Sequence, residues 1–308
     1  MDNLTHTLLG LALADALPAT RLGRGGTLAL LLASNLPDLD VLAPGLLGAE
    51  VFEVRRTLTH SLLGAPLLAA AGTAGMRLFG AGVARGPLFG LFLLGIAVHV
   101  FFDLVNSFGV LLLFPFDGRR LELAWIFIVD PFLAAIPLAS AVLARARLPR
   151  ERTARIALAL VAAYVAFCGL GRALGARLLE RTIREEGIRA EFTYVFPEAL
   201  GPHRFRGVAR SGGEWRVWLL HVLSGRADPL GGVPTEEDAP EVREVRRCRA
   251  SQGLGRFFLA PVWRWLPEVG EAEVFDLRFR SAVLAWRKTP FVYRVRATPD
   301  GEGIRSGG

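Results

Sequence analysis

The chain has 308 residues, of which 52% are hydrophobic, and its mean hydropathy is +0.38. That average is too apolar for one soluble domain, and the apolar residues are concentrated before about residue 178. The formal net charge is +7, but no basic cluster is interleaved with a recognisable nucleic-acid-reading motif, so we expect no nucleic acid partner.

The first 178 residues contain a series of long uncharged segments. Residues 57–76, for example, are twenty residues without Asp, Glu, Lys or Arg, which as a helix is enough to cross roughly 30 Å of hydrocarbon. We therefore expect an α-helical polytopic membrane domain over residues 1–178, in contact with the lipid bilayer. Its helices, about six in number and the first of them short for a full span, are predicted at residues 5–20, 27–47, 57–76, 87–113, 122–143 and 155–176.

The second predicted helix is interrupted at residues 35–40, which read Asn-Leu-Pro-Asp-Leu-Asp. Pro37 breaks the helical hydrogen bonding, and non-helical backbone at membrane depth is tolerated only beside protein or a water-filled cavity. A break that carries both Asp38 and Asp40 therefore indicates a binding site. The alternative is that the helix simply ends at Pro37, near the membrane surface.

The arginines between the predicted helices are distributed unevenly. Nine lie in the first, third and fifth loops, against four in the second and fourth. Since cytoplasmic loops carry the excess of positive charge, we expect the odd loops inside and the C-terminal domain outside the cytoplasm. This orientation brings the ionisable residues of the apolar region to the extracytoplasmic side, which predicts one shared site. These residues are His6, Asp38, Asp40, His60, His99, Asp103 and Asp130.

Beyond residue 177 the pattern changes to short aromatic and β-branched segments separated by Gly- and Pro-rich turns such as residues 229–234. We expect a small β-rich (α+β) soluble domain over residues 179–308. Trp263 and Trp265, with the neighbouring phenylalanines, are predicted to pack in its core or to form an aromatic surface at the membrane. The predicted strands are residues 191–196, 214–222, 273–279 and 291–297.

The polar residues of the apolar region have the chemistry of metal ligands. Ionisable groups in a bilayer are costly and usually face one another, water or a metal, and His with Asp suits zinc and similar divalent ions. His99 and Asp103 are four residues apart and so share one helix face, although the pair alone is also explained by a simple hydrogen bond. Asp38 and Asp40 need a cation to offset their repulsion.

A divalent ion held by such residues activates water for hydrolysis. A surplus carboxylate then serves as general base, for which Asp40 and Asp103 are equal candidates. We expect Thr59, Asn106 and Asp130 to support the ligands, with capping of the turn before Pro131 as the alternative for Asp130.

Several motifs occur in order over residues 1 to about 135. They are Met1-Asp-x-Leu-Thr-His6, Leu36-Pro-Asp-Leu-Asp40, Arg56-x-Leu-Thr-His60-Ser61, His99-x-x-x-Asp103 with Asn106-Ser-Phe-Gly109, and Phe114-Pro-Phe with Trp125-Ile-Phe-Ile-Val-Asp130-Pro. In these motifs the chain resembles the YdjM-type family of membrane-bound metal-dependent hydrolases, which is also described as LexA-binding and inner-membrane-associated. The resemblance implies an inner-membrane location and a regulatory protein partner. It also implies a set of metal and active-site residues, His6, Asp38, Asp40, His60, His99 and Asp103.

The leading hypothesis is a membrane-integral hydrolase in which a metal-activated water, with zinc as the expected metal, attacks a phosphoester or an ester of a small-molecule or lipid-derived substrate. The alternative is a non-enzymatic membrane scaffold or regulator with a structural His/Asp metal site. A transporter is disfavoured because no inverted repeat is visible and the polar groups gather on one side.

Overall fold

The computed structural model describes residues 1–44, 51–80, 83–146, 148–284, 291–296 and 304–307. It divides the chain into two compact units, residues 1–169 and 170–308. The division lies inside helix α8 (Arg150–Glu185), a few residues before the expected boundary at 178. The predicted helix end at 45–47 and the predicted last strand residue Ala297 lie outside the described residues.

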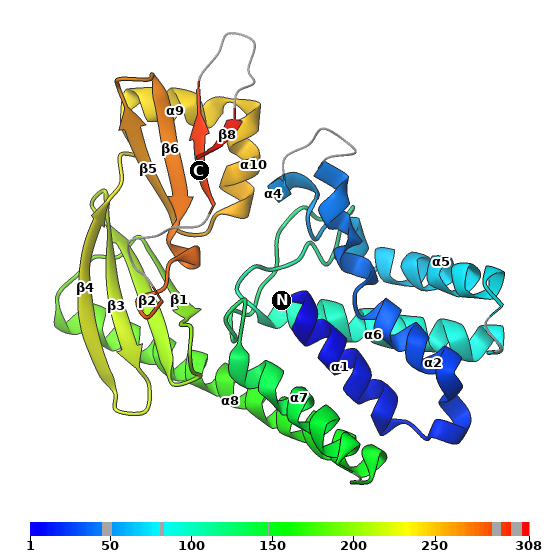
Figure 1. Cartoon of the computed structure of the whole chain (residues 1–308). Coiled ribbons are helices and arrows are strands. Elements are labelled where there is room, and N and C mark those ends of the chain that lie inside the picture. The colour runs from blue at the N-terminus through cyan, green and yellow to red at the C-terminus, as the bar shows by residue number, and fades with distance from the viewer. Residues whose placement is uncertain (45–50, 81–82, 147, 285–290, 297–303, 308) are drawn as a thin grey trace. The chain divides into compact units, whose positions relative to one another are not determined.

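Unit 1 is helical (Figure 1). Helix α6 packs against both α2 and α5, and α1 packs against α2 and α7. Two short 3-10 helices, η1 and η2, lie between α2 and α5. The elements are α1 (Asn3–Ala16), α2 (Ala19–Ala33), η1 (Leu36–Leu42), α4 (Val51–Val54), η2 (Leu58–His60), α5 (Gly64–Leu78), α6 (Arg85–Val105), α7 (Pro131–Arg145) and the first part of α8.

The expectation of about six spanning helices is corrected to two candidate spans. Among the described residues, only α6 and α8 are long and apolar enough to cross a membrane. Helices α1, α2, α5 and α7 have 14 or 15 residues. At a rise of 1.5 Å per residue they extend about 21–23 Å, which is less than the roughly 30 Å of a bilayer core.

The helices are shorter than predicted because the apolar sequence continues beyond the residues at which they end. The predicted helix at 87–113 ends at Val105, where the Asn106 side chain accepts a hydrogen bond from the Phe108 N–H. The next helix begins only at Pro131, with irregular backbone between them. The predicted break in α-helical structure at residues 35–40 is present, since α2 ends at Ala33 and Pro37 stands at the start of the 3-10 helix η1.

Small residues let the helices of unit 1 approach closely. A Cβ atom at Gly95 of α6 would lie 2.6 Å from the Cβ of Ala33 in α2, and a Cβ at Gly10 of α1 would lie 2.4 Å from the Ser34 hydroxyl oxygen. Both positions therefore require glycine if α1, α2 and α6 are to keep their spacing. This packing brings His6, the end of α2 and His99 together.

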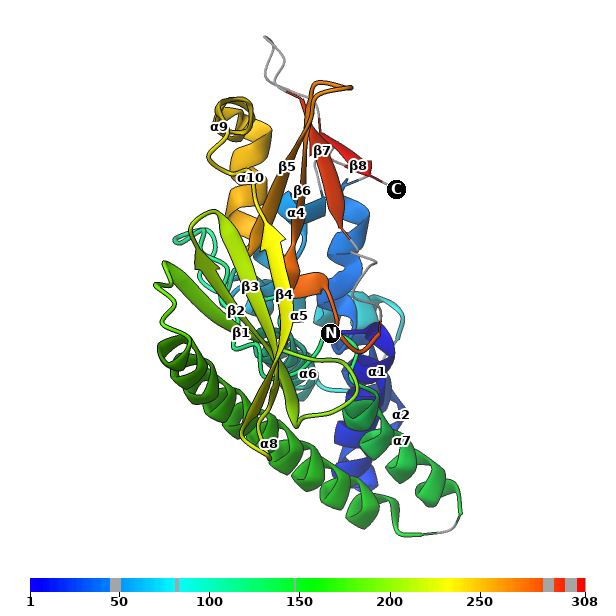
Figure 2. The same cartoon turned by 90° about the vertical axis from the view of Figure 1, so that its left-hand side faces the viewer.

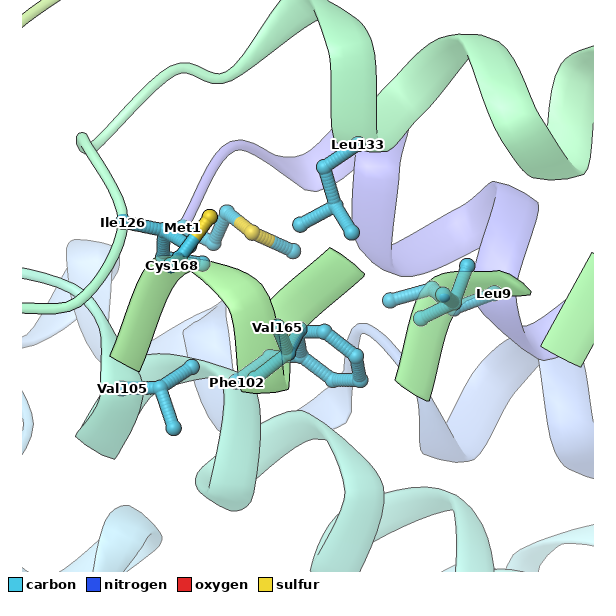
Figure 3. Close-up of a cluster of buried hydrophobic side chains, with 9 residues drawn as sticks. Met1, Leu9, Phe102, Val105, Ile126, Leu133, Val165 and Cys168 are labelled. Atoms are coloured by element: carbon cyan, nitrogen blue, oxygen red, sulfur yellow. The ribbon is translucent and has the colours of Figure 1, made fainter. Parts of the chain in front are cut away.

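A hydrophobic cluster joins α1, α6, α7 and α8 beside the C-terminal end of α6 (Figure 3). Leu9, Leu133 and Val165 come from α1, α7 and α8, and Phe102 and Val105 come from α6. Phe102 precedes Asp103, so this cluster holds one face of the α6 turn that presents Asp103. The cluster comprises Met1, Leu9, Phe102, Val105, Ile126, Leu133, Val161, Val165 and Cys168.

Unit 2 contains two four-stranded antiparallel sheets, each with its strands in chain order. Leu179 and Ile183, near the end of α8, pack on Phe205 and Trp218 of the first sheet, which Figure 2 shows alongside that helix. The elements are β1 (Phe192–Pro197), β2 (Arg204–Ser211), β3 (Glu214–His221), β4 (Arg226–Pro234), α9 (Pro240–Arg247), α10 (Arg249–Phe257), β5 (Pro261–Leu266), β6 (Glu271–Asp276), η3 (Leu277–Phe279), β7 (Val292–Val295) and β8 (Ile304–Gly307).

The β-rich prediction for this region is confirmed, with one correction of detail. Residues 229–234 were expected as a turn but belong to β4, an edge strand of the first sheet. Trp263 is 2% exposed, and Phe257 and Phe258 are also buried. The structure therefore shows core packing for these three rings, whereas Trp265 is only partly buried.

Candidate metal centre

Four buried side chains converge between η1, η2 and α6. One potential ligand atom from each of Asp38, His60, His99 and Asp103 lies within 4.8 Å of the other three. Asp38 comes from η1, His60 from η2, and the other two from successive turns of α6, as their four-residue spacing predicts. All four side chains are at most 4% exposed.

The hydrogen bonds of the two imidazoles indicate where their protons lie. His99 Nδ1 is 2.7 Å from the Ser34 carbonyl oxygen, which can only accept, so Nδ1 carries the hydrogen. The Thr59 hydroxyl donates to Asp40 Oδ2 at 3.0 Å, and its oxygen is 2.9 Å from His60 Nδ1. That oxygen therefore accepts from Nδ1–H of His60. With Nδ1 of each ring engaged in this way, Nε2 is the nitrogen that faces the centre.

These two Nε2 atoms face one another at 3.1 Å. Asp103 Oδ2 lies 3.1 Å from the His60 nitrogen and 3.5 Å from the His99 nitrogen. Two imidazole nitrogens and a carboxylate directed at one point are the kind of donor set that binds a divalent cation. Since zinc–nitrogen bonds are about 2.0–2.1 Å, two nitrogens on one tetrahedral zinc are roughly 3.3 Å apart. The donor set therefore fits a divalent ion such as zinc.

The unsatisfied atoms of the centre support the same fit. Among the described residues, Asp38 Oδ2 and His6 Nε2 are buried and have no hydrogen-bond partner. Buried polar atoms normally have a partner, so these two are available to a ligand. His6 stacks on His99 with ring centroids 3.7 Å apart, and its Nε2 is 3.4 Å from Asp103 Oδ1.

Asp40 flanks the compact set of four on the far side of His60. Its Oδ2 is 3.4 Å from His60 Nδ1 and accepts a hydrogen bond from the Arg56 backbone N–H at 2.7 Å. Burial opposes ionisation of Asp40, but the contact with His60 and the charge of Arg55 outweigh it and hold the pKa of this carboxyl below its ordinary value. Asp40 therefore orients the His60 ring as an ionised carboxylate.

Of the three residues expected to support the ligands, two lie at the centre. Thr59 bridges Asp40 and His60, and the Asn106 amide donates to Asp103 Oδ1 at 3.1 Å. Asp130 instead accepts hydrogen bonds from the first N–H groups of α7 and from the Tyr164 hydroxyl. Within the described part of the chain, Asp130 has no hydrogen bond to the centre, so it serves as the α7 cap.

Two arginines at the centre were not among the predicted site residues, although Arg56 stands in one of the motifs. Arg55 lies 3.1 Å from Asp38 Oδ1 and 3.3 Å from Asp40 Oδ1. Arg56 is 3% exposed, and its Nε is 2.9 Å from Asp103 Oδ2. Their position just before the Leu-Thr-His segment of η2 is the signal that could have identified them. Asp103 also contacts the main-chain nitrogen of Met1.

A family model described as YdjM inner membrane protein matches residues 1–174. The chain belongs to this family. The match confirms the resemblance drawn from the motifs and identifies the chain as an inner membrane protein, in keeping with the two apolar helices of sufficient length. The YdjM region contains all four residues of the compact set and ends within α8. No curated protein and no solved structure matches the chain.

Proposed function

We propose that this YdjM-family protein is a membrane-integral, metal-dependent hydrolase of ester or phosphoester bonds. The observation that carries the proposal is the convergence of two imidazole lone pairs and two carboxylates in a buried centre. A divalent ion such as zinc, when bound there, lowers the pKa of a bound water and polarises the bond to be cleaved.

The residues around the centre have distinct proposed tasks. Asp38, His60, His99 and Asp103 hold the metal, with His6 as a further donor beside Asp103. Asp40 is the proposed general base, because it lies beside the compact set without belonging to it. Its Oδ2 is held by the Thr59 hydroxyl and the Arg56 backbone N–H, and its Oδ1 is 3.3 Å from Arg55 Nε. Of the two equal candidates for the base, Asp103 is thereby placed among the ligands.

The second candidate function is a non-enzymatic membrane scaffold or regulator, acting on a protein partner. It is favoured by the ion pairs of Arg55 and Arg56, which offset much of the charge of the three aspartates without a metal. A structural site differs from a catalytic one because all of its coordination positions are occupied by protein.

Metal analysis followed by a hydrolysis screen distinguishes the two functions. We expect the purified full-length protein to carry stoichiometric divalent metal and to hydrolyse members of a phosphoester and ester panel. Chelation should remove both the metal and the activity, and zinc should restore them. Stoichiometric metal without hydrolysis of any panel member would favour the scaffold, and absence of metal would refute the hydrolase.

The membrane topology proposed from the arginine count gives a further prediction. If α8 spans the inner membrane, the loop between α7 and α8 is cytoplasmic and unit 2 is extracytoplasmic. Reporter fusions placed after residue 150 and at the C-terminus should then give opposite cytoplasmic and periplasmic signals. Equal signals from the two fusions would show that α8 does not cross the membrane.

A further inference from the structure

The two segments that carry site residues, η1 and η2, bury their charged or polar side chains and expose their apolar ones. In η1, the charged residues Asp38 and Asp40 are buried, whereas Leu39, Val41 and Leu42 are 56%, 57% and 59% exposed. A soluble protein normally buries the leucines and exposes the carboxylates. This arrangement indicates that the outer face of η1 lies against hydrocarbon.

The same pattern recurs in and after η2, which contacts η1. His60 is fully buried, while Leu58, Leu62 and Leu63 are between 42% and 63% exposed. Together the two segments carry an exposed apolar surface beside the buried centre. We call this surface the apolar collar, and its members are Leu39, Val41, Leu42, Leu58, Leu62 and Leu63. In an inner membrane protein, an exposed apolar surface of this kind is suited to contact with lipid acyl chains.

Among the charged side chains of the centre, that of Arg55 is the most exposed. Its side chain is 18% exposed, whereas those of Asp38, Asp40, Arg56 and the other members of the centre are at most 4% exposed. Arg55 is also the cation that contacts the carboxylates of η1. A substrate that reaches the centre therefore meets a guanidinium group at the margin of the apolar collar.

The charge of the centre favours an anionic reacting group. Three aspartates face two arginines and the Met1 amino group there, so a divalent ion would leave at least one positive charge in excess. A phosphate group supplies a compensating negative charge, whereas a neutral carboxylic ester does not. Arginine is suited to this task because its planar guanidinium binds phosphate oxygens in a bidentate manner.

We infer that the substrate is a membrane lipid with a phosphoester, whose acyl chains lie against the apolar collar while Arg55 binds its phosphate. This inference rests on the proposed hydrolase function and selects the substrate class. In the reaction, a water oxygen forms the new bond to phosphorus, and the P–O ester bond breaks with its electron pair on the leaving oxygen. The proton that water loses to Asp40 passes to that leaving oxygen, which departs as an alcohol.

The test compares three probes on the full-length, zinc-loaded protein in detergent micelles. They are a long-chain phosphatidic acid, the water-soluble glycerol 3-phosphate, and the neutral ester dioleoylglycerol. We expect kcat/KM for the long-chain phosphoester to exceed the other two values by at least about tenfold, because binding of the chains contributes to transition-state stabilisation. Equal or faster hydrolysis of either other probe overturns the inference but leaves the hydrolase function standing. No hydrolysis of any probe by metal-loaded protein overturns both.

Two variants test the named contacts. Arg55→Gln should raise KM for the long-chain phosphoester more than it lowers kcat, with partial rescue in Arg55→Lys. Leu62→Asn should lower kcat/KM for the long-chain probe but not for glycerol 3-phosphate. Its matched control is Leu138→Asn in α7, a leucine of 50% exposure outside the collar, which should change neither value. An unchanged KM in Arg55→Gln, or equal effects of the two leucine variants, would overturn the inference.

Discussion

His60→Ala and His99→Ala are each expected to abolish bound metal and hydrolysis together. Each imidazole directs an Nε2 lone pair into the centre, and the two nitrogens are 3.1 Å apart. Removing one of them takes away one of the two imidazole donors of the compact set and leaves zinc with fewer of the nitrogen ligands that it prefers. The measurement is elemental analysis of the purified full-length protein alongside the hydrolysis assay.

The matched control for these variants is His221→Ala in β3. His221 also pairs with a carboxylate, that of Asp228 at 3.0 Å, but it belongs to the other unit. We expect this variant to retain full metal content and activity. Because alanine at a buried position leaves a cavity, His60→Gln is measured in parallel. Wild-type metal content in both His60 variants would remove His60 from the ligand set.

Asp40→Asn should retain most of the metal while lowering hydrolysis by roughly 10²–10⁴-fold, the usual contribution of a general base. The asparagine side chain has the same shape, so its carbonyl oxygen can still accept from the Arg56 N–H and the Thr59 hydroxyl. It cannot take a proton from water at neutral pH. Metal content and kcat are measured on the same preparation.

Asp103→Asn is expected to behave differently from Asp40→Asn. Asp103 Oδ2 contacts both imidazole nitrogens, so this substitution is expected to remove metal as well as activity. If Asp40→Asn loses metal as completely as Asp103→Asn, then Asp40 is a ligand and not the base. If Asp40→Asn keeps full activity, the base lies elsewhere.

The residues of the centre could be predicted from the sequence, but which of them form the compact set of four and which flank it could not. Polar residues in apolar segments identified all six candidate ligands, because a bilayer makes such residues costly. Their separation into a compact set of four and two flanking residues depends on ring orientation. His99, for instance, is oriented by the Ser34 carbonyl, 65 residues away, and no local pattern encodes that contact.

The helix lengths could not be predicted for a related reason. Hydropathy does not distinguish an apolar helix from apolar irregular backbone, and residues 107–116 are of the second kind. In unit 2, the proline and glycines of residues 229–232 predicted a turn. They are accommodated in β4 because this strand lies at a sheet edge, where a missing backbone donor is tolerated.

The close crossing of α1, α2 and α6 has a consequence for how this centre tolerates mutation. Gly95 lies one turn before His99 and directly against Ala33, whose neighbour Ser34 holds the His99 ring. One added methyl group at Gly95 would push two helices apart and turn the imidazole away from its partners, without touching any ligand. The geometry of the ligand atoms therefore depends on the distance between the helices. We expect substitutions at the helix contacts, as well as at the ligands, to cause loss of the metal.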